Sequence, residues 1–90
     1  MKRLRIIVSG RVQGVGFRWA TQKTAQQLGV NGYVRNLPSG DVEIVIEGDE
    51  VSVERMISWA RQGPAFARVD NLKMDEIPGP AEYTGFRVAG

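Results

Sequence analysis

Two residue types that often carry enzyme chemistry are missing from this chain. It contains no cysteine and no histidine. The absence of cysteine excludes disulfides, thiolate nucleophiles and Cys-ligated zinc. The absence of histidine removes the commonest general base and the commonest nitrogen ligand for metals. Any chemistry must therefore use arginine, lysine, amide, carboxylate or hydroxyl side chains, or backbone N–H groups.

Long apolar stretches are missing as well. No run approaches the roughly 18 apolar residues that a membrane-spanning helix needs, and the apolar run at residues 6–8 stops at Ser9-Gly10. The basic N-terminus is not followed by an apolar segment of signal-peptide length. We therefore expect a cytoplasmic protein with no membrane partner.

The composition is that of a small folded domain. Hydrophobic residues make up 42% of the chain and charged residues 24%, and both fractions are close to globular averages, which disfavours disorder. There is no internal repeat, low-complexity segment or linker. The length predicts one domain over residues 1–90.

Charge is unevenly distributed between the two halves of the chain. Residues 1–40 contain 7 of the 12 basic residues and no acidic ones, whereas residues 41–90 contain the other 12 − 7 = 5 and all 10 acidic residues. The first half thus has a net charge of +7 and the second half a net charge of −5. This asymmetry indicates that the first half meets an anion, with nucleic acid, phosphate and carboxylate as candidates. Chance clustering in a fold that interleaves the halves is the alternative.

Hydrophobic periodicity predicts the order of helices and strands. Alternating patterns predict strands over residues 3–9, 32–37, 42–47 and 67–77 and a short final strand at 86–88. The strand at 67–77 changes phase, which predicts a bulge. Helical spacing predicts a helix over 18–28, closed by Gly29, and a second helix between Asp49 and Gly63.

This order predicts an α+β fold of the ferredoxin-like β-α-β-β-α-β type. Two helices would cover one face of an antiparallel-rich sheet, and a short extra strand would follow at the C-terminus. The fold by itself does not decide the activity, because it hosts many unrelated functions.

A glycine-rich loop joins the first strand to the first helix, over residues 10–18. Unpaired N–H groups at a helix start bind anions, and an arginine there adds a planar fork that matches two phosphate oxygens. Neither nucleotide-binding pattern is present, since the loop lacks Gly-Lys-Ser/Thr and Trp19 stands where a third glycine is required. On the residues alone, a tight turn with a solvated Arg18 is equally open.

Two motifs resemble the signatures of the acylphosphatase family. The run Gly10-Arg11-Val12-Gln13-Gly14-Val15-Gly16-Phe17-Arg18 is similar to Gly-any-Val-Gln-Gly-Val-any-Phe-Arg, and Gly32-Tyr33-Val34-Arg35-Asn36 is similar to Gly-aromatic-Val-any-Asn. The spacing between the motifs, the length and the element order also resemble the family across essentially the whole chain.

The resemblance implies an activity and a set of site residues. It implies hydrolysis of acyl phosphates to a carboxylate and inorganic phosphate by direct attack of water, with no metal, cofactor or covalent intermediate. Arg18 would bind the phosphoryl group and Asn36 would orient the water. The substrate-binding amides would be those of Gln13, Gly14, Val15, Gly16, Phe17 and Arg18. An alternative for Asn36 is a purely structural amide that anchors the turn at 37–40.

Other polar and aromatic residues receive structural interpretations. We expect core or groove packing for Trp19, Trp59, Tyr33 and Phe86. We expect solvated or phosphate-steering roles for Arg3, Arg5, Arg11 and Arg35. The acidic residues at one exposed strand face are expected to be solvated and not to bind metal: Glu43, Glu47 and Asp49.

Three other functions remain as alternatives to an enzyme. One is an RNA- or DNA-binding module, although the strand at 42–47 carries acids where an RNA platform needs aromatics. Another is a non-catalytic anion-binding regulatory domain, and a third is an accessory domain of a larger maturation enzyme. We expect a free-standing monomer that acts on a small acyl phosphate and binds no nucleic acid.

Overall fold

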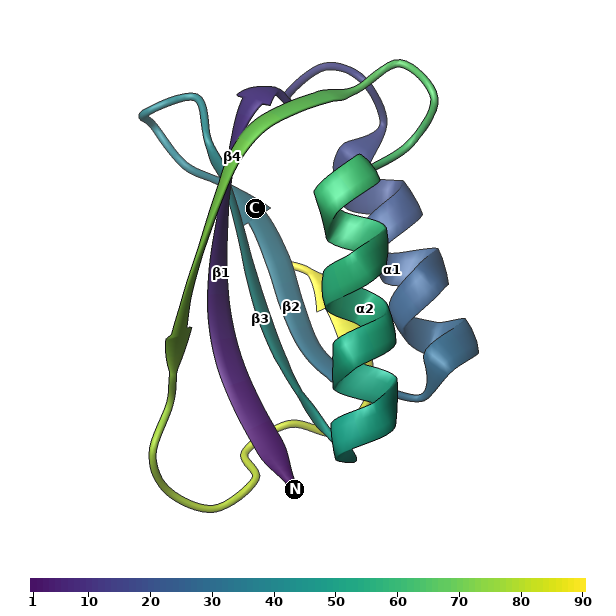
Figure 1. The fold of residues 1–90 in the computed structure, drawn as a ribbon, viewed down its shortest axis with the longest axis vertical. Coiled ribbons are helices and arrows are strands. Elements are labelled where there is room, and N and C mark those ends of the chain that lie inside the picture. The colour runs from purple at the N-terminus through teal and green to yellow at the C-terminus, as the bar shows by residue number, and fades with distance from the viewer.

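A computed structural model describes residues 1–90 and places two helices on one face of a five-stranded sheet (Figure 1). The predicted ferredoxin-like order and the extra final strand are confirmed. The elements are β1 (Lys2–Arg11), α1 (Phe17–Leu28), β2 (Asn31–Asn36), β3 (Val42–Gly48), α2 (Glu50–Gln62), β4 (Arg68–Glu76) and β5 (Phe86–Val88).

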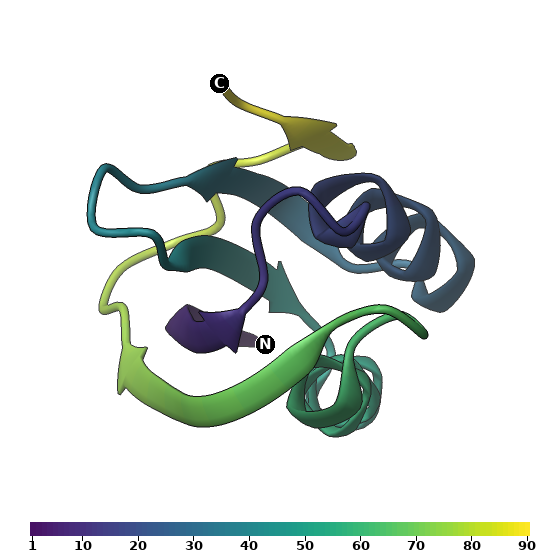
Figure 2. The same ribbon diagram turned by 90° about the horizontal axis from the view of Figure 1, so that it is seen from above.

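The sheet has the strand order β4-β1-β3-β2-β5. All neighbouring strands run antiparallel except β2 and β5, which are parallel. Figure 2 shows β5 along the outer side of β2, on the opposite edge from β4. The end of the chain thereby returns to the strand that carries the second motif.

The core lies between the helices and one face of the sheet. Alternate residues of the central strands point into it, as the period of 2 predicts, and they meet the apolar stripes of both helices. Burial of each large apolar side chain contributes about 1.5–3 kcal/mol. The buried set includes Leu4, Ile6, Val8, Phe17, Ala25, Val34, Val42, Ile44, Ile46, Val53, Met56, Ile57 and Ala60.

The predicted helix ends are confirmed at two places. Gly29 closes α1 with a left-handed φ of 75°, and its N–H donates to the carbonyl of Ala25. The Asp49 carboxylate accepts a hydrogen bond from the N–H of Ser52 at 2.9 Å and so caps α2. Gly16 precedes α1 and provides no side-chain cap, so the N-terminus of α1 remains open.

The predicted bulge lies where β4 pairs with the end of β1. Ser9 faces Asn71 and Gly10 faces Val69, which leaves Asp70 as the extra residue. Gly10 has φ 128°, and a Cβ there would lie 2.2 Å from the carbonyl oxygen of Arg68. Only glycine therefore fits where the chain leaves the sheet for the loop.

The sheet face opposite the helices differs from the sequence-based prediction. Arg3 is 6% exposed, and Glu43 and Glu47 are each 2% exposed, so the prediction that these three are solvated is wrong. Arginine side chains from the neighbouring strands cover the two carboxylates. The alternating pattern along one strand does not show which residues the neighbouring strands bring beside it. Arg5 and Arg35 each donate to Glu43 at 2.6 Å and remain partly exposed.

Candidate active site

The loop between β1 and α1 presents backbone N–H groups with no partner in the protein. Gly14 and Gly16 have left-handed φ values of 75° and 77°, which glycine adopts without strain. The N–H groups of residues 13–16 donate no hydrogen bond, and the first paired N–H of the helix is that of Ala20, which donates to Gly16 at 3.1 Å. The first turn of α1 contains no acidic residue. Unpaired N–H groups and the absence of acidic residues are the features that suit a helix start to binding an anion.

Arg18 stands in the first turn of α1, beside these N–H groups. Its side chain is half-buried, and its Nη1 donates to the carbonyl oxygen of Gly90 at 2.8 Å. This contact places the residues after β5 next to the start of the helix. No acidic side chain pairs with Arg18, and its one recorded contact is this bond to Gly90.

Asn36 ends β2 with its side chain on the core side of the sheet, the same side as buried Val34. Its Oδ1 is buried and accepts no hydrogen bond. The adjacent turn is instead tied by Gln13, whose Nε2 donates to the carbonyl oxygens of Leu37 and Asp41, both at 2.9 Å. The anchoring role that was the alternative for Asn36 thus belongs to Gln13.

One cavity of about 290 Å³ brings the predicted residues together. Four of the six predicted loop residues border it together with Asn36. Gln13 and Val15 do not, because Gln13 reaches the turn and Val15 packs against the core. The lining consists of Val12, Gly14, Gly16, Phe17, Arg18, Trp19, Asn36 and Val88.

Sequence reasoning missed three residues of this lining: Val12, Trp19 and Val88. Core or groove packing was expected for Trp19, but it borders the cavity with 64% of its surface exposed. The adjacency of Trp19 to Arg18 on one helical turn was an available signal. Val88 gave none, because it is 88 − 18 = 70 positions from Arg18 and only the parallel pairing of β5 brings it near.

Gly32 explains why the second motif begins with glycine. It has φ 141°, and a Cβ at this position would lie 1.8 Å from the carbonyl oxygen of Val45. Its own N–H donates to the carbonyl of Gly85 at 3.0 Å, next to its pairing with Phe86. This glycine therefore lets β2 approach β3 closely while β5 docks on its other side.

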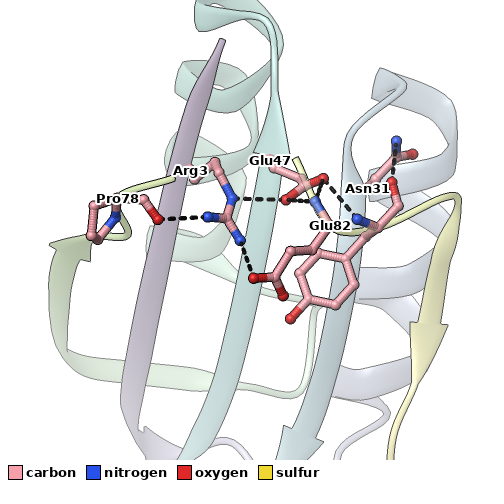
Figure 3. A network of polar contacts seen from close by, with 6 residues as sticks. Arg3, Asn31, Glu47, Pro78 and Glu82 are labelled. Carbon is pink, nitrogen blue, oxygen red and sulfur yellow. Dashed lines mark hydrogen bonds and ion pairs between the residues drawn. The ribbon is translucent and has the colours of Figure 1, made fainter. Parts of the chain in front are cut away.

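A buried ion pair ties the segment before β5 to the sheet (Figure 3). Glu47 accepts from Arg3 Nε and from the N–H groups of Glu82 and Tyr83, each at 2.9 Å, and Arg3 Nη1 donates to the carbonyl of Pro78 at 2.8 Å. Burial raises the pKa of Glu47, but the two N–H donors and Arg3 outweigh burial, so this pKa lies below its ordinary value.

Glu43, on the same face, shows the same balance. Burial raises the pKa of Glu43, whereas hydrogen bonds from Arg35, Arg5 and Tyr33 lower it, and the net pKa is lowered. Both carboxylates lie on the face of the sheet away from the helices, so they hold the sheet together without approaching the cavity. No group of three or more Asp or Glu residues is placed to hold a metal ion.

Comparison with known proteins identifies the family. The family model described as Acylphosphatase matches residues 4–88. The chain belongs to the acylphosphatase family. An acylphosphatase of Thermococcus kodakarensis is 52% identical over 92 residues, which cover the whole of both chains. The crystal structure of acylphosphatase from Bacillus subtilis superimposes with a TM-score of 0.95 at 34% identity, with full coverage of both chains.

The acylphosphatase fold also occurs inside a much larger protein. The structure of T. kodakarensis HypF matches 100% of this chain but only 12% of its own, with a TM-score of 0.87 at 36% identity. The full-length acylphosphatases match end to end. The chain is thus an acylphosphatase, an enzyme that hydrolyses acyl phosphates. Neither helix is long and apolar enough to cross a membrane.

Proposed function

We propose that this acylphosphatase hydrolyses its substrate by direct attack of water on phosphorus, without metal, cofactor or covalent intermediate. The water oxygen forms a new bond to phosphorus, and the bond from phosphorus to the acyl oxygen breaks. The electron pair of that bond leaves with the carboxylate, and the protons of the water pass to phosphate oxygens. Because a carboxylate is a good leaving group, little acid catalysis is needed, which agrees with the lack of histidine.

The loop and Arg18 would hold the phosphoryl group. Backbone N–H groups of residues 13–18 have no partner in the protein and lie at the helix N-terminus, where the dipole favours negative charge. The Arg18 guanidinium offers a fork for two phosphoryl oxygens. Because these donors are fixed before the substrate arrives, they stabilise charge in the transition state with little reorganisation.

The single observation that carries the water-positioning role is the unpaired Oδ1 of Asn36. A buried polar atom without a partner costs about 1–3 kcal/mol, and this one borders the same cavity as Arg18 and the loop glycines. A water in the cavity would satisfy it, because the amide oxygen accepts a hydrogen bond and leaves a water lone pair free to attack phosphorus. The turn is anchored by Gln13, and the Oδ1 of Asn36 accepts no hydrogen bond from it, which supports the water-positioning role.

Asn36→Ala tests this role, and Asn31→Ala is a matched control on the same strand. Asn31 uses its amide structurally, since Oδ1 accepts from the N–H of Gly85 at 3.2 Å and Nδ2 donates to the carbonyl of Tyr83 at 3.3 Å. We expect Asn36→Ala to lower kcat for an acyl phosphate by about 10²-fold while inorganic phosphate inhibits as before. Asn31→Ala should lose about 1–2 kcal/mol of stability and keep its kcat.

The measurements are kcat, the inhibition constant of inorganic phosphate and the urea midpoint for both variants. A folded Asn36→Ala enzyme with near-wild-type kcat would remove Asn36 from the mechanism. If phosphate affinity and kcat fell together, Asn36 would belong to anion binding and not to water positioning.

We further infer that one copy of the chain, folded as a single domain over residues 1–90, is the working unit. The loop, Arg18 and Asn36 meet at one cavity within a single copy, so the proposed site needs no residue from a second copy. Nucleic acid is disfavoured because β3 carries Glu43 and Glu47 and has no aromatic residue on which a base could stack. Sedimentation and cell fractionation check the monomeric state and the cytoplasmic location.

A further inference from the structure

The side chain of Gln13 joins two segments at one end of the sheet. One segment is the loop between β1 and α1, and the other is the turn at 37–41, which directly follows Asn36 (Figure 1). The Nε2 of Gln13 donates to the carbonyl oxygens of Leu37 and Asp41, both at 2.9 Å. A primary amide nitrogen carries two hydrogens, so Gln13 uses both of them to hold the two sides of the turn.

These two hydrogen bonds lie immediately beyond Asn36. Asn36 forms the last pair of the β2–β3 ladder, with Val42, and Leu37 and Asp41 are the next residue on each side. The N–H of Leu37 also donates to the carbonyl of Asp41 at 2.9 Å. Strand ends beside exposed loops open more readily than the middle of a sheet. The amide of Gln13 therefore supports the end of β2 that carries Asn36.

No other hydrogen bond joins the turn to the loop. The remaining hydrogen bonds of residues 37–41 stay within the turn. The loop has support of its own, because Val12 and Phe17 are each 1% exposed and Val15 packs against the core. Loss of the Gln13 side chain should therefore leave the loop in place and release the turn.

We infer that Gln13 is a positioning residue, which sets the separation between the phosphoryl group in the loop and the water held by Asn36. This inference rests on the proposed function, because it needs both groups at those places. Attack on phosphorus requires the reacting atoms at about 3–3.5 Å and in line, and a misplacement of about 1 Å can cost about 10²-fold in rate. The loop supplies one partner of this geometry and β2 the other, and Gln13 connects them.

Gln13→Met tests this role, because methionine has a similar length and donates no hydrogen bond from its side chain. The backbone N–H of residue 13 stays in the loop. We expect kcat for acetyl phosphate to fall about tenfold, while the inhibition constant of inorganic phosphate stays within about twofold of wild type. Gln22→Met is the matched control, since Gln22 Nε2 also donates to a backbone carbonyl, that of Phe86 at 3.2 Å, and Gln22 does not border the cavity. This control should keep kcat within about twofold of wild type.

A double-mutant cycle with Asn36→Ala distinguishes positioning from a general loss of structure. If Gln13 acts through Asn36, then Gln13→Met should lower kcat by less than about twofold in the Asn36→Ala background. An equal fall in both backgrounds would overturn the inference, because Gln13 would then act independently of Asn36. A weakening of phosphate inhibition as large as the fall in kcat would also overturn it, because the side chain would then support the loop.

Two further results would count against the role of Gln13. One is an unchanged kcat for Gln13→Met, and the other is an equal fall for Gln13→Met and Gln22→Met. Failure of the proposed function gives a different pattern, since Asn36→Ala alone would then keep its kcat. Urea midpoints of all variants show whether the rates are measured on folded enzyme.

Discussion

Replacing Glu47 by glutamine tests whether the buried Arg3–Glu47 pair holds the C-terminal segment in place. The change keeps the shape of the side chain and removes its charge. The new amide nitrogen would face donors, since the carboxylate accepts from Arg3 Nε and from the N–H groups of Glu82 and Tyr83. Glutamine can accept with only one of its two terminal atoms.

The expected loss follows from burial. Arg3 is 6% exposed and Glu47 is 2% exposed, and removal of one partner from a buried ion pair costs about 3–5 kcal/mol because the other charge stays buried and unpaired. Natural domains have stabilities of about 5–15 kcal/mol. We therefore expect Glu47→Gln to lower the urea midpoint strongly, with the slope of the transition unchanged.

Glu54→Gln provides the control, because Glu54 pairs with Lys2 at 3.5 Å with 59% of its side chain exposed. The same substitution there should cost less than about 1 kcal/mol. If Glu47→Gln also cost less than about 1 kcal/mol, the pair would not anchor the segment. The folded Glu47→Gln enzyme should keep its kcat, since no atom of Glu47 borders the cavity.

The pH dependence gives a second readout of the same carboxylate. The pKa of Glu47 lies below its ordinary value of 4.5 in the folded protein, so the unfolded chain binds the proton more tightly. Its contribution to stability is complete above pH 4.5 and is lost as the pH falls through the lower folded pKa. Urea midpoints measured downward from pH 6 should therefore fall less steeply for Glu47→Gln than for the wild type, and equal slopes would contradict this.

Two predictions concern the mechanism. Arg18→Ala should lower kcat/KM by at least about 10²-fold, or about 3 kcal/mol. Arg18→Lys should also lose activity, because lysine offers a point charge and not a fork. More than about a tenth of wild-type activity in the alanine variant would exclude Arg18 from the mechanism. Incubation with EDTA should leave the rate unchanged, and a loss of activity reversed by Mg²⁺ would contradict the metal-free mechanism.

Much of the fold could be predicted from the sequence because local patterns determine it. Alternation of apolar and polar residues predicted β1 and β3, and Gly29 predicted the end of α1. The change of phase after Val69 predicted the bulge in β4. The loop and Asn36 were found through two motifs whose spacing is a property of the chain alone, and the structure brings Arg18 and Asn36 to one cavity.

What could not be predicted depends on which strands become neighbours. Glu43 and Glu47 looked solvated because the pattern along β3 does not show that arginines of β1 and β2 lie across it. Val88 joins the cavity only through the parallel pairing of β5 with β2. Both features follow from the strand order and the pairing register of the sheet, which depend on residues far apart in the sequence.

The place of β1 between β4 and β3 has a consequence for how the chain folds as it is synthesised. Leu4 pairs with Ile46, 46 − 4 = 42 positions later, and with Glu76, 76 − 4 = 72 positions later. Closing such loops is slow relative to local hairpin formation, so the β2–β3 hairpin forms early and β1 keeps an open edge until β4 has left the ribosome. The cavity draws on residues from Val12 to Val88. Nascent chains released before β5 should therefore lack a complete cavity, and activity appears only when synthesis is nearly finished.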